Sequence, residues 1–328
     1  MSAPIDPAPS LRVCSYEDRL AAMDSLVLMG ESLCRADPRV SLHLTVPHAP
    51  PFVCAWAEQR PQVRIRTAPP PGLRGWNVKP WLLLQELNAG APEAVWLDDD
   101  IIVTRSVAAL LDEFPRDSLL AAEEWAHSPV PRSHFWNLSS GGRLPVLNSC
   151  FIRATQAHRP LLERWLQMLH DPRYLAAQEL PFAQRPVPLR QDGSLLMALL
   201  ESQDFSELHY DCIRKGRHIA QCAGSSGYRP LHRVLDLARG LPPLIHGIGR
   251  KPWEAEPEPR LVRRFLLDLA ADVSPYVLAA RRIARTLDRN PPWVEARTRP
   301  GRMLRGLTNG HPALAGLPLA IPHAFLRR

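Results

Sequence analysis

Short apolar runs alternate with longer amphipathic stretches over the first hundred residues of the chain. The runs of strand length occupy residues 11–16, 40–46, 63–68 and 94–97. Helical patterns follow the first three runs, over residues 17–34, 52–58 and 76–88. Strands that alternate with helices in this way are typical of a doubly wound, mostly parallel sheet flanked by helices. The sequence therefore predicts a Rossmann-like α/β fold.

The alternation is looser in the second half of the chain. Strand-like runs cover residues 119–125 and 146–154, helical patterns cover 106–114 and 158–170, and a further helix is expected just after Asp192. Residues 126–143 are polar and rich in proline and serine, which predicts a loop. Residues 204–240 have a mixed pattern that assigns no element. An apolar segment at 242–253 then closes the ordered part.

Three consecutive aspartates, Asp98, Asp99 and Asp100, directly follow the fourth apolar run and precede another, Ile101 to Val103. If residues 94–103 form one strand, Asp98 and Asp100 point to the same face. Two carboxylates on one face repel each other unless a cation neutralises them. In a doubly wound sheet, ligands also collect at the carboxyl ends of strands. We therefore expect a divalent cation here, in preference to a solvated acidic turn.

The length of the chain and the distribution of its charge indicate how it divides into domains. A chain of 328 residues suits one large domain with additions, or two small ones. The net charge is +7, and residues 254–328 hold 13 arginines against 7 acidic residues. We expect a leader at 1–10, a main domain at 11–253, and an α-helical, basic C-terminal extension at 254–328.

Composition excludes several classes of protein. The six cysteines are scattered and form no CxxC pair, so they indicate neither a zinc module nor a disulfide framework. The first ten residues lack the basic and apolar regions of a secretory signal. Residues 307–326 are uncharged, but three prolines interrupt them and argue against a transmembrane helix. A cytoplasmic protein is therefore expected.

Five motifs occur in a recognisable order: WNVKPWLLLQEL, VWLDDDIIV, VLNSCFIR, RQDGSLLMALL and HGIGRKPW. In this order they resemble the nucleotide-sugar glycosyltransferases of the GT-A fold, most closely the retaining, DxD-containing family-eight type. The similarity covers about residues 11–253. It implies a hexosyltransferase that uses a UDP-sugar donor and a divalent metal.

The resemblance implies a metal site made of Asp98, Asp100 and His246. A metal there stabilises the nucleoside diphosphate that leaves when the sugar-phosphate bond breaks. An imidazole beside two carboxylates favours Mn²⁺ over Mg²⁺, because nitrogen ligands suit transition metals. By the same analogy, Asp99 faces the ribose of the nucleotide or a neighbouring base.

Several side chains are expected to bind the donor. Gly247 and Gly249 allow the backbone to approach a phosphate closely, and Lys251 adds a compact positive charge. Lys79 can reach an acidic group near the donor, and the alternative is a solvated lysine at a helix start. Tyr16, after the first strand, can stack on uracil.

Asn148, Ser149, Gln191 and Asp192 are expected where donor and acceptor sugars meet. The family carries Asn-Ser-Gly, whereas Cys150 stands in the third place here, which predicts a narrower pocket or a turned strand. The family's Asp-Gln step is inverted, so either side chain of the pair can face the sugar. Asp192 then stabilises an oxocarbenium-like centre or holds the acceptor, and its alternative role is to cap the next helix.

The extension interleaves arginines with apolar residues. Arg281, Arg282 and Arg285 lie among Val277, Leu278, Ile283 and Leu287, and Arg302 and Arg305 lie among Met303, Leu304 and Leu307. This pattern suits a helix on an anionic membrane surface, or equally an arginine-rich helix packed on the domain. Many bacterial relatives act on lipid-linked acceptors in polysaccharide biosynthesis, which gives peripheral contact with the inner face of the membrane a purpose.

The sequence as a whole predicts a metal-dependent glycosyltransferase that moves a hexose, from UDP-glucose or UDP-galactose, to a saccharide or lipid-linked saccharide with retention. One alternative is a catalytically silent protein that binds a nucleotide-sugar. Another is a sugar-nucleotide pyrophosphorylase, but residues 14–19 lack the glycine-rich basic loop it needs. Nucleic-acid binding has little base-reading or stacking pattern behind it.

Overall fold

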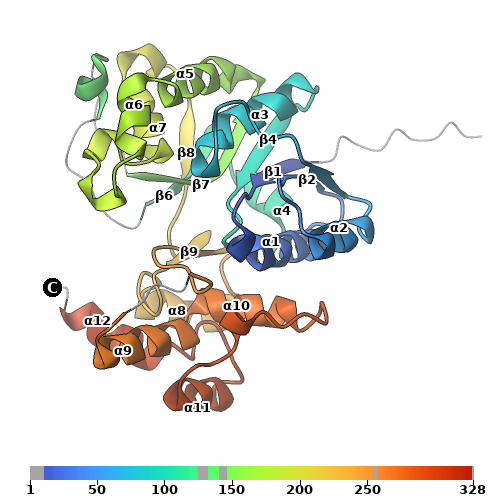
Figure 1. Cartoon of the computed structure of the whole chain (residues 1–328), viewed down its shortest axis with the longest axis vertical. Coiled ribbons are helices and arrows are strands. Elements are labelled where there is room, and N and C mark those ends of the chain that lie inside the picture. The colour runs from blue at the N-terminus through green and yellow to red at the C-terminus, as the bar shows by residue number, and fades with distance from the viewer. Residues whose placement is uncertain (1–10, 125–131, 140–145, 255–257, 327–328) are drawn as a thin grey trace, which may run out of the picture. The chain divides into compact units, whose positions relative to one another are not determined.

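The computed structural model describes residues 11–124, 132–139, 146–254 and 258–326 of the chain (Figure 1). The chain forms two compact units, each built from several segments. Unit 1 comprises Met1–Asp18, Pro38–Asp98 and Leu111–Cys212, and unit 2 comprises Arg19–Asp37, Asp99–Leu110 and Ile213–Arg328. The sequence predicts a single boundary at residue 253, between a main domain and an extension, whereas each of these units combines segments from several parts of the chain. The predicted boundary stays a prediction.

Unit 1 contains a seven-stranded sheet in the order β3-β2-β1-β4-β7-β6-β8. Its strands are β1 (Arg12–Tyr16), β2 (Ser41–Thr45), β3 (Val63–Arg66), β4 (Glu93–Leu97), β6 (Leu119–Glu123), β7 (Leu147–Thr155) and β8 (Tyr210–Ile213). Neighbours from β3 to β4 pair in parallel, whereas β7 runs antiparallel to both β4 and β6. The predicted mostly parallel α/β sheet is confirmed.

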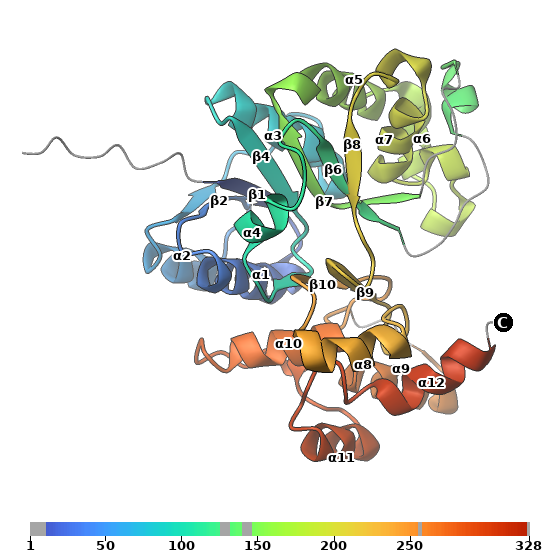
Figure 2. The same ribbon diagram turned by 180° about the vertical axis from the view of Figure 1, so that it is seen from behind.

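Helices cover this sheet because their apolar residues need burial. They are α2 (Pro51–Glu58), α3 (Lys79–Asn88), α5 (Arg159–Leu169), α6 (Pro172–Gln178) and α7 (Asp192–Leu200). Every residue of α7 is buried, in keeping with its apolar sequence. Figure 2 shows α5, α6 and α7 gathered near one another, and a common core joins them to α3, β4 and β7.

Unit 2 contains a small sheet in the order β5-β10-β9, formed by β5 (Ile101–Val103), β9 (Ile219–Cys222) and β10 (Leu244–Gly247). Its helices are α1 (Met23–Ala36), α4 (Val107–Leu111), α8 (Pro230–Arg239), α9 (Leu261–Asp272), α10 (Pro275–Ala284), α11 (Arg299–Leu307) and α12 (Leu317–Leu326). Tyr276 stacks on Trp293 with ring centroids 6.0 Å apart in the core of this unit. The described residues after position 258 of this unit form the helices α9 to α12 (Figure 2).

The expected strand through the three aspartates is wrong. Strand β4 ends at Leu97, Asp99 and Asp100 form a turn, and Ile101 begins β5, which pairs antiparallel with β10. Aspartate favours turns because its side chain hydrogen-bonds the local backbone. The two apolar runs therefore enter different sheets, and the argument from alternating faces does not apply.

Two further expectations from the sequence are refined. The first helix begins at Met23, after a single 3₁₀ turn, and not at residue 17. The expected loop at 126–143 lies partly outside the described residues. Among the described helices, none is long and apolar enough to cross a membrane.

Candidate active site

Four polar side chains of unit 1 converge at the carboxyl end of β4. They come from four elements: Lys79 begins α3, Asp98 follows β4, Ser149 lies in β7, and Asp192 begins α7. Lys79 Nζ donates a hydrogen bond to Ser149 Oγ at 2.8 Å and lies 3.2 Å from Asp98 Oδ1 and 3.3 Å from Asp192 Oδ2. Ser149 Oγ donates to Asp192 Oδ2 at 2.7 Å. We call these four residues the lysine cluster.

Local structure explains how the sequence brings them together. The Asp98 N–H donates to the carbonyl oxygen of Cys150 at 2.9 Å, so the ladder between β4 and β7 continues into the aspartates. A Cβ on Gly193 would lie 3.4 Å from Ser149 Oγ, at van der Waals distance, so the first turn of α7 lies directly beside β7. Trp165 Nε1 donates to the Asp192 carbonyl at 3.1 Å and fixes the start of α7 from α5.

Burial makes the charges of the lysine cluster interdependent. Lys79 is 2% exposed and Asp192 is 3% exposed. Burial disfavours the charged lysine, but the carboxylates of Asp192 and Asp98 outweigh this effect and raise the pKa of Lys79. For Asp192, burial is the larger effect and raises the pKa, although Lys79 and Ser149 oppose it. Lys79 thus remains charged and is shared between two carboxylates.

The cluster decides between the readings that the sequence left open. Lys79 is not a solvated helix-start lysine. Asp192 is the first residue of α7 and not its cap, because Gln191 holds the cap position; within the described residues the Gln191 side chain makes no capping hydrogen bond. Strand β7 continues through Cys150, which is fully buried, so this residue does not turn the strand. The Asn148 side chain contacts a residue outside the lysine cluster: its Nδ2 donates a hydrogen bond to Glu124 Oε2 at 2.9 Å.

A second polar cluster lies in unit 2. His246, in β10, places Nε2 3.3 Å from Asp100 Oδ1, and Lys251 Nζ donates to Asp100 Oδ2 and to the Gly247 carbonyl. Asp100 is 3% exposed and His246 is 4% exposed. Burial disfavours the Asp100 carboxylate, but Lys251 and His246 overcome this and hold its pKa well below the ordinary value. We call these three residues the histidine cluster.

The two expected glycines serve different needs. A Cβ on Gly247 would lie 2.9 Å from the Tyr276 ring, so Gly247 permits close packing of β10 against α10. Gly249 has a φ of +74°, which favours glycine, and it turns the chain so that Lys251 returns to Asp100.

The middle aspartate has partners that sequence reasoning did not identify. The Asp99 carbonyl accepts a hydrogen bond from Ser25 Oγ at 2.8 Å, and Ser25 Oγ lies 2.8 Å from the Tyr276 hydroxyl. Arg19 Nη2 lies 3.7 Å from Asp99 Oδ1. The residues of each contact lie 74 or more positions apart in the sequence, so no local sequence pattern could have predicted these contacts.

Trp96 was also missed as a site residue. Its Nε1 donates to Asp98 Oδ1 at 2.6 Å, and Lys79 Nζ lies 5.5 Å from the centroid of its ring. Its position two residues before Asp98 in the sequence could have indicated this contact. Tyr16 is buried, and its hydroxyl donates to Asp18 Oδ2 at 3.1 Å, while the expected stacking on uracil stays a prediction.

No family model and no curated protein matches the chain. Among solved structures, it is similar to the galactosyltransferase LgtC in complex with donor and acceptor sugar analogues, with 15% identity, a TM-score of 0.53, and coverage of 86% of this chain and 98% of that one. The chain therefore has the α/β fold of the GT-A glycosyltransferases.

Two other solved structures resemble the chain at TM-scores below 0.5. The bifunctional glycosyltransferase WbbM has 14% identity and a TM-score of 0.49, and the match covers 77% of this chain and 48% of WbbM. This chain thus spans about half of WbbM. Mouse xyloside xylosyltransferase 1 has 14% identity and a TM-score of 0.46, with coverage of 73% and 97%. The fold assignment does not rest on either.

We predict that Lys79→Met lowers the free energy of unfolding by about 3 kcal/mol, because it leaves two carboxylates without their shared cation. Adding Asp192→Asn should restore at least about 1 kcal/mol of this loss, since one of the two charges is then removed. Urea unfolding of the parent, both single variants and the double variant measures the coupling. Strictly additive losses would contradict the shared-cation arrangement.

Asp192→Asn should also change how stability depends on pH. An acid whose pKa is raised in the folded state contributes stability below its unfolded pKa and loses it as pH rises through the folded value. The parent should therefore lose stability relative to Asp192→Asn as pH rises from about 4 toward 8. Unfolding free energies across this range test the prediction, with the exposed Asp112→Asn as control. A difference that stays constant with pH would exclude the raised pKa.

Proposed function

We propose that the protein is a metal-dependent glycosyltransferase that moves a hexose from a UDP-sugar to a saccharide or lipid-linked saccharide, with retention. The observation that carries this proposal is the lysine cluster. Four polar side chains from separate elements, three of them buried, converge at a strand end, the position where ligands bind in open α/β sheets. The GT-A fold supports the same reaction class.

Asp98, Asp100 and His246 carry the side-chain types that could hold a metal ion. A single residue, Asp99, separates Asp98 from Asp100 along the chain, so the covalent backbone keeps them near each other. Asp100 Oδ1 and His246 Nε2 are 3.3 Å apart, close to the ~3 Å between neighbouring ligands at about 2.1 Å from one metal. Within the described residues, the buried Asp100 Oδ1 and His246 Nδ1 have no hydrogen-bond partner. These residues therefore fit a metal.

Such a metal, Mn²⁺ or Mg²⁺, would neutralise the diphosphate of the donor. The chain's own residues have further roles in the proposal. Lys251, which now contacts Asp100, can add positive charge to the leaving diphosphate. Gly249 gives the backbone before Lys251 its turn, and Asp99 is proposed to face the ribose of the donor, with Tyr16 toward its base.

Asp192 is the proposed group beside the sugar. Its buried carboxyl is held by Ser149 and Lys79, so its position is fixed before substrate binds. A carboxylate in this position can stabilise positive charge that develops at the anomeric carbon. Gln191 and Asn148 remain proposed contacts to donor or acceptor.

The reaction proposal predicts transfer from UDP-glucose or UDP-galactose only with Mn²⁺ or Mg²⁺. Asp98→Ala, Asp100→Ala and His246→Ala should each lower the rate by about 10²-fold or more, because each removes a proposed ligand. The control is Asp112→Ala, which removes an exposed carboxylate of the same kind. Release of UDP and formation of glycoside are the measurements.

A different outcome separates the rival function. UDP binding seen by calorimetry, without transfer across a panel of donors, would indicate a catalytically silent nucleotide-sugar-binding protein. Unchanged turnover in all three variants of the proposed ligands would contradict the metal-dependent proposal.

Membrane contact is proposed through α9 and not through α10. The apolar residues Val277 and Leu278 of α10 are buried in unit 2, as the packed-helix alternative expects. In contrast, α9 exposes Leu261 by 81%, Val262 by 74% and Leu266 by 56%. Arginines lie between these residues in the sequence. An exposed apolar patch flanked by arginine has the chemistry of a helix that rests on an anionic bilayer.

The double variant Leu261→Ser/Leu266→Ser should therefore sediment several-fold less with phosphatidylserine vesicles, because it removes the apolar contact. The matched control is Leu231→Ser, which alters a leucine of α8 that is 66% exposed. Equal sedimentation of all three proteins, or equal binding to neutral vesicles, would contradict the proposal.

A further inference from the structure

Two aromatic side chains of unit 1 lie together on the surface. Trp76, in the 3₁₀ turn Gly75–Val78, is 43% exposed, and Phe182, in the 3₁₀ turn Phe182–Gln184, is 48% exposed. Their rings meet edge to face, with centroids 6.5 Å apart. Large aromatic side chains that stay exposed next to each other form a surface that a binding partner can cover. We call these two residues the aromatic pair.

Contacts within unit 1 connect the aromatic pair to the lysine cluster. Trp76 comes three residues before Lys79, the first residue of α3. The buried Tyr174 of α6 donates a hydrogen bond to Asn77 Oδ1 at 2.7 Å, which fixes α6 to the turn that carries Trp76. Burial raises the pKa of Tyr174, and the nearby Asp192 carboxylate raises it further. The aromatic pair therefore borders the place proposed for sugar transfer.

Two arginines, Arg185 and Arg190, lie against the Phe182 ring, with their guanidinium carbons 5.9 and 5.5 Å from its centroid. Arg185 is held by uncharged acceptors, which include Gln178 Oε1 at 2.6 Å and the Leu180 carbonyl at 2.9 Å. The buried Arg190 Nε has no hydrogen-bond partner among the described residues. Within the same part of the chain, neither arginine pairs with a carboxylate. We call these two residues the arginine pair.

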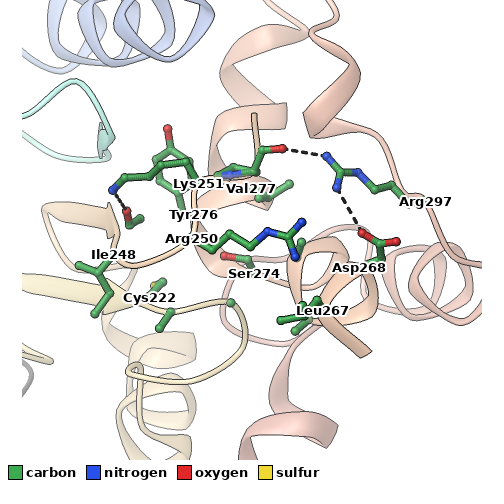
Figure 3. Close-up of a pocket in the computed structure, with 16 residues that line it drawn as sticks. Cys222, Ile248, Arg250, Lys251, Leu267, Asp268, Ser274, Tyr276, Val277 and Arg297 are labelled. Atoms are coloured by element: carbon green, nitrogen blue, oxygen red, sulfur yellow. Dashed lines mark hydrogen bonds and ion pairs between the residues drawn. The ribbon is translucent and has the colours of Figure 1, made fainter. Parts of the chain in front are cut away.

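Arginines in other settings of this protein are neutralised by a carboxylate. Arg173 of α6 also lies over aromatic rings, but it pairs with Asp171 at 2.9 Å. In unit 2, Arg297 lines a hollow of about 240 Å³ and pairs with Asp268 at 3.2 Å (Figure 3). The arginine pair differs, because its contacts are an aromatic ring and uncharged oxygens. Its positive charge is therefore available to an anion that comes from outside the chain.

We propose that the acceptor of the transfer is an acidic saccharide, which stacks a sugar ring on the aromatic pair and binds Arg190 through a carboxylate or phosphate group. The inference rests on the proposed function in making this saccharide the acceptor. The C–H groups of a sugar ring carry partial positive charge and suit the negative face of an aromatic ring. The planar guanidinium group donates two hydrogen bonds at once to a carboxylate or phosphate. A neutral sugar leaves the arginine pair without an anion, and a free anion leaves the aromatic pair uncovered.

The test is calorimetric titration of the whole chain with trigalacturonate, which carries carboxylates, and with glucose 6-phosphate, which carries a phosphate. We expect saturable binding, and the tighter of the two ligands identifies the anionic group. Trp76→Ala removes a stacking ring and Arg190→Gln removes the charge, so each should weaken binding by about fivefold or more. The matched control is Arg164→Gln, which changes an exposed arginine of α5 and should leave the affinity within about twofold.

Further titrations decide the chemistry of the ligand. Equally tight binding of neutral maltotriose would overturn the acidic assignment, and equally tight binding of inorganic phosphate would overturn the saccharide assignment. Displacement of the acid by UMP would put a nucleotide on the aromatic pair and would also overturn the inference. Parental affinity in Arg190→Gln would overturn the site even if Trp76→Ala disturbs folding, because the Arg190 side chain makes no hydrogen bond within the described residues.

Binding and sugar transfer can fail separately, because the titration needs neither donor nor metal. Binding of an acidic saccharide without transfer from any donor would contradict the proposed function and support the saccharide site. Transfer to neutral acceptors by a protein that binds neither acid would overturn this inference and support the proposed function.

Discussion

One buried lysine cation shared by two carboxylates is the constraint on which the end of the large sheet depends. A buried charge is costly unless it is paired and hydrogen-bonded. Lys79 therefore requires Asp98, Ser149 and Asp192 within reach at the same time. These residues come from β4, β7 and the start of α7, so the pairing of the strands and the packing of the helix both serve the same few contacts. The contacts of Lys79 therefore depend on the strand pairing and the helix packing of unit 1.

The three aspartates divide between two electrostatic settings. Asp100 is paired with Lys251 and His246, so it stays ionised. Asp98 lies in the lysine cluster, where it shares the Lys79 cation with Asp192. The turn at Asp99 and Asp100 makes this division, because it ends β4 and sends the next apolar run into the other sheet. A continuous strand would have placed Asp98 and Asp100 on the same face.

Sequence reasoning found the strands of the first 155 residues, apart from the break between β4 and β5, because each of them is an apolar run with clear limits. It assigned no element to residues 204–240, where β8, β9 and α8 lie. It also named Lys79, Asp100, His246 and Lys251, because they lie in the motifs that resemble a glycosyltransferase family. It could not pair Lys79 with Asp192, since 113 positions separate them and only the fold brings them together. The turn was missed because apolar residues on both sides of the aspartates resemble one strand. For α10, an amphipathic pattern cannot tell burial in a protein core from contact with lipid.

The inverted Gln-Asp step has a physical explanation in this arrangement. Gln191 holds the cap position in extended backbone, and Asp192 begins α7 with its carboxyl against Ser149 and Lys79. The charge of Asp98 contributes to the raised pKa of Asp192. Any positive charge that binds Asp98 therefore lowers the pKa of Asp192 as well, and the ionised form becomes more stable. In the proposed reaction, binding of the cation with its donor would thus favour the carboxylate at the moment when the sugar needs a negative neighbour.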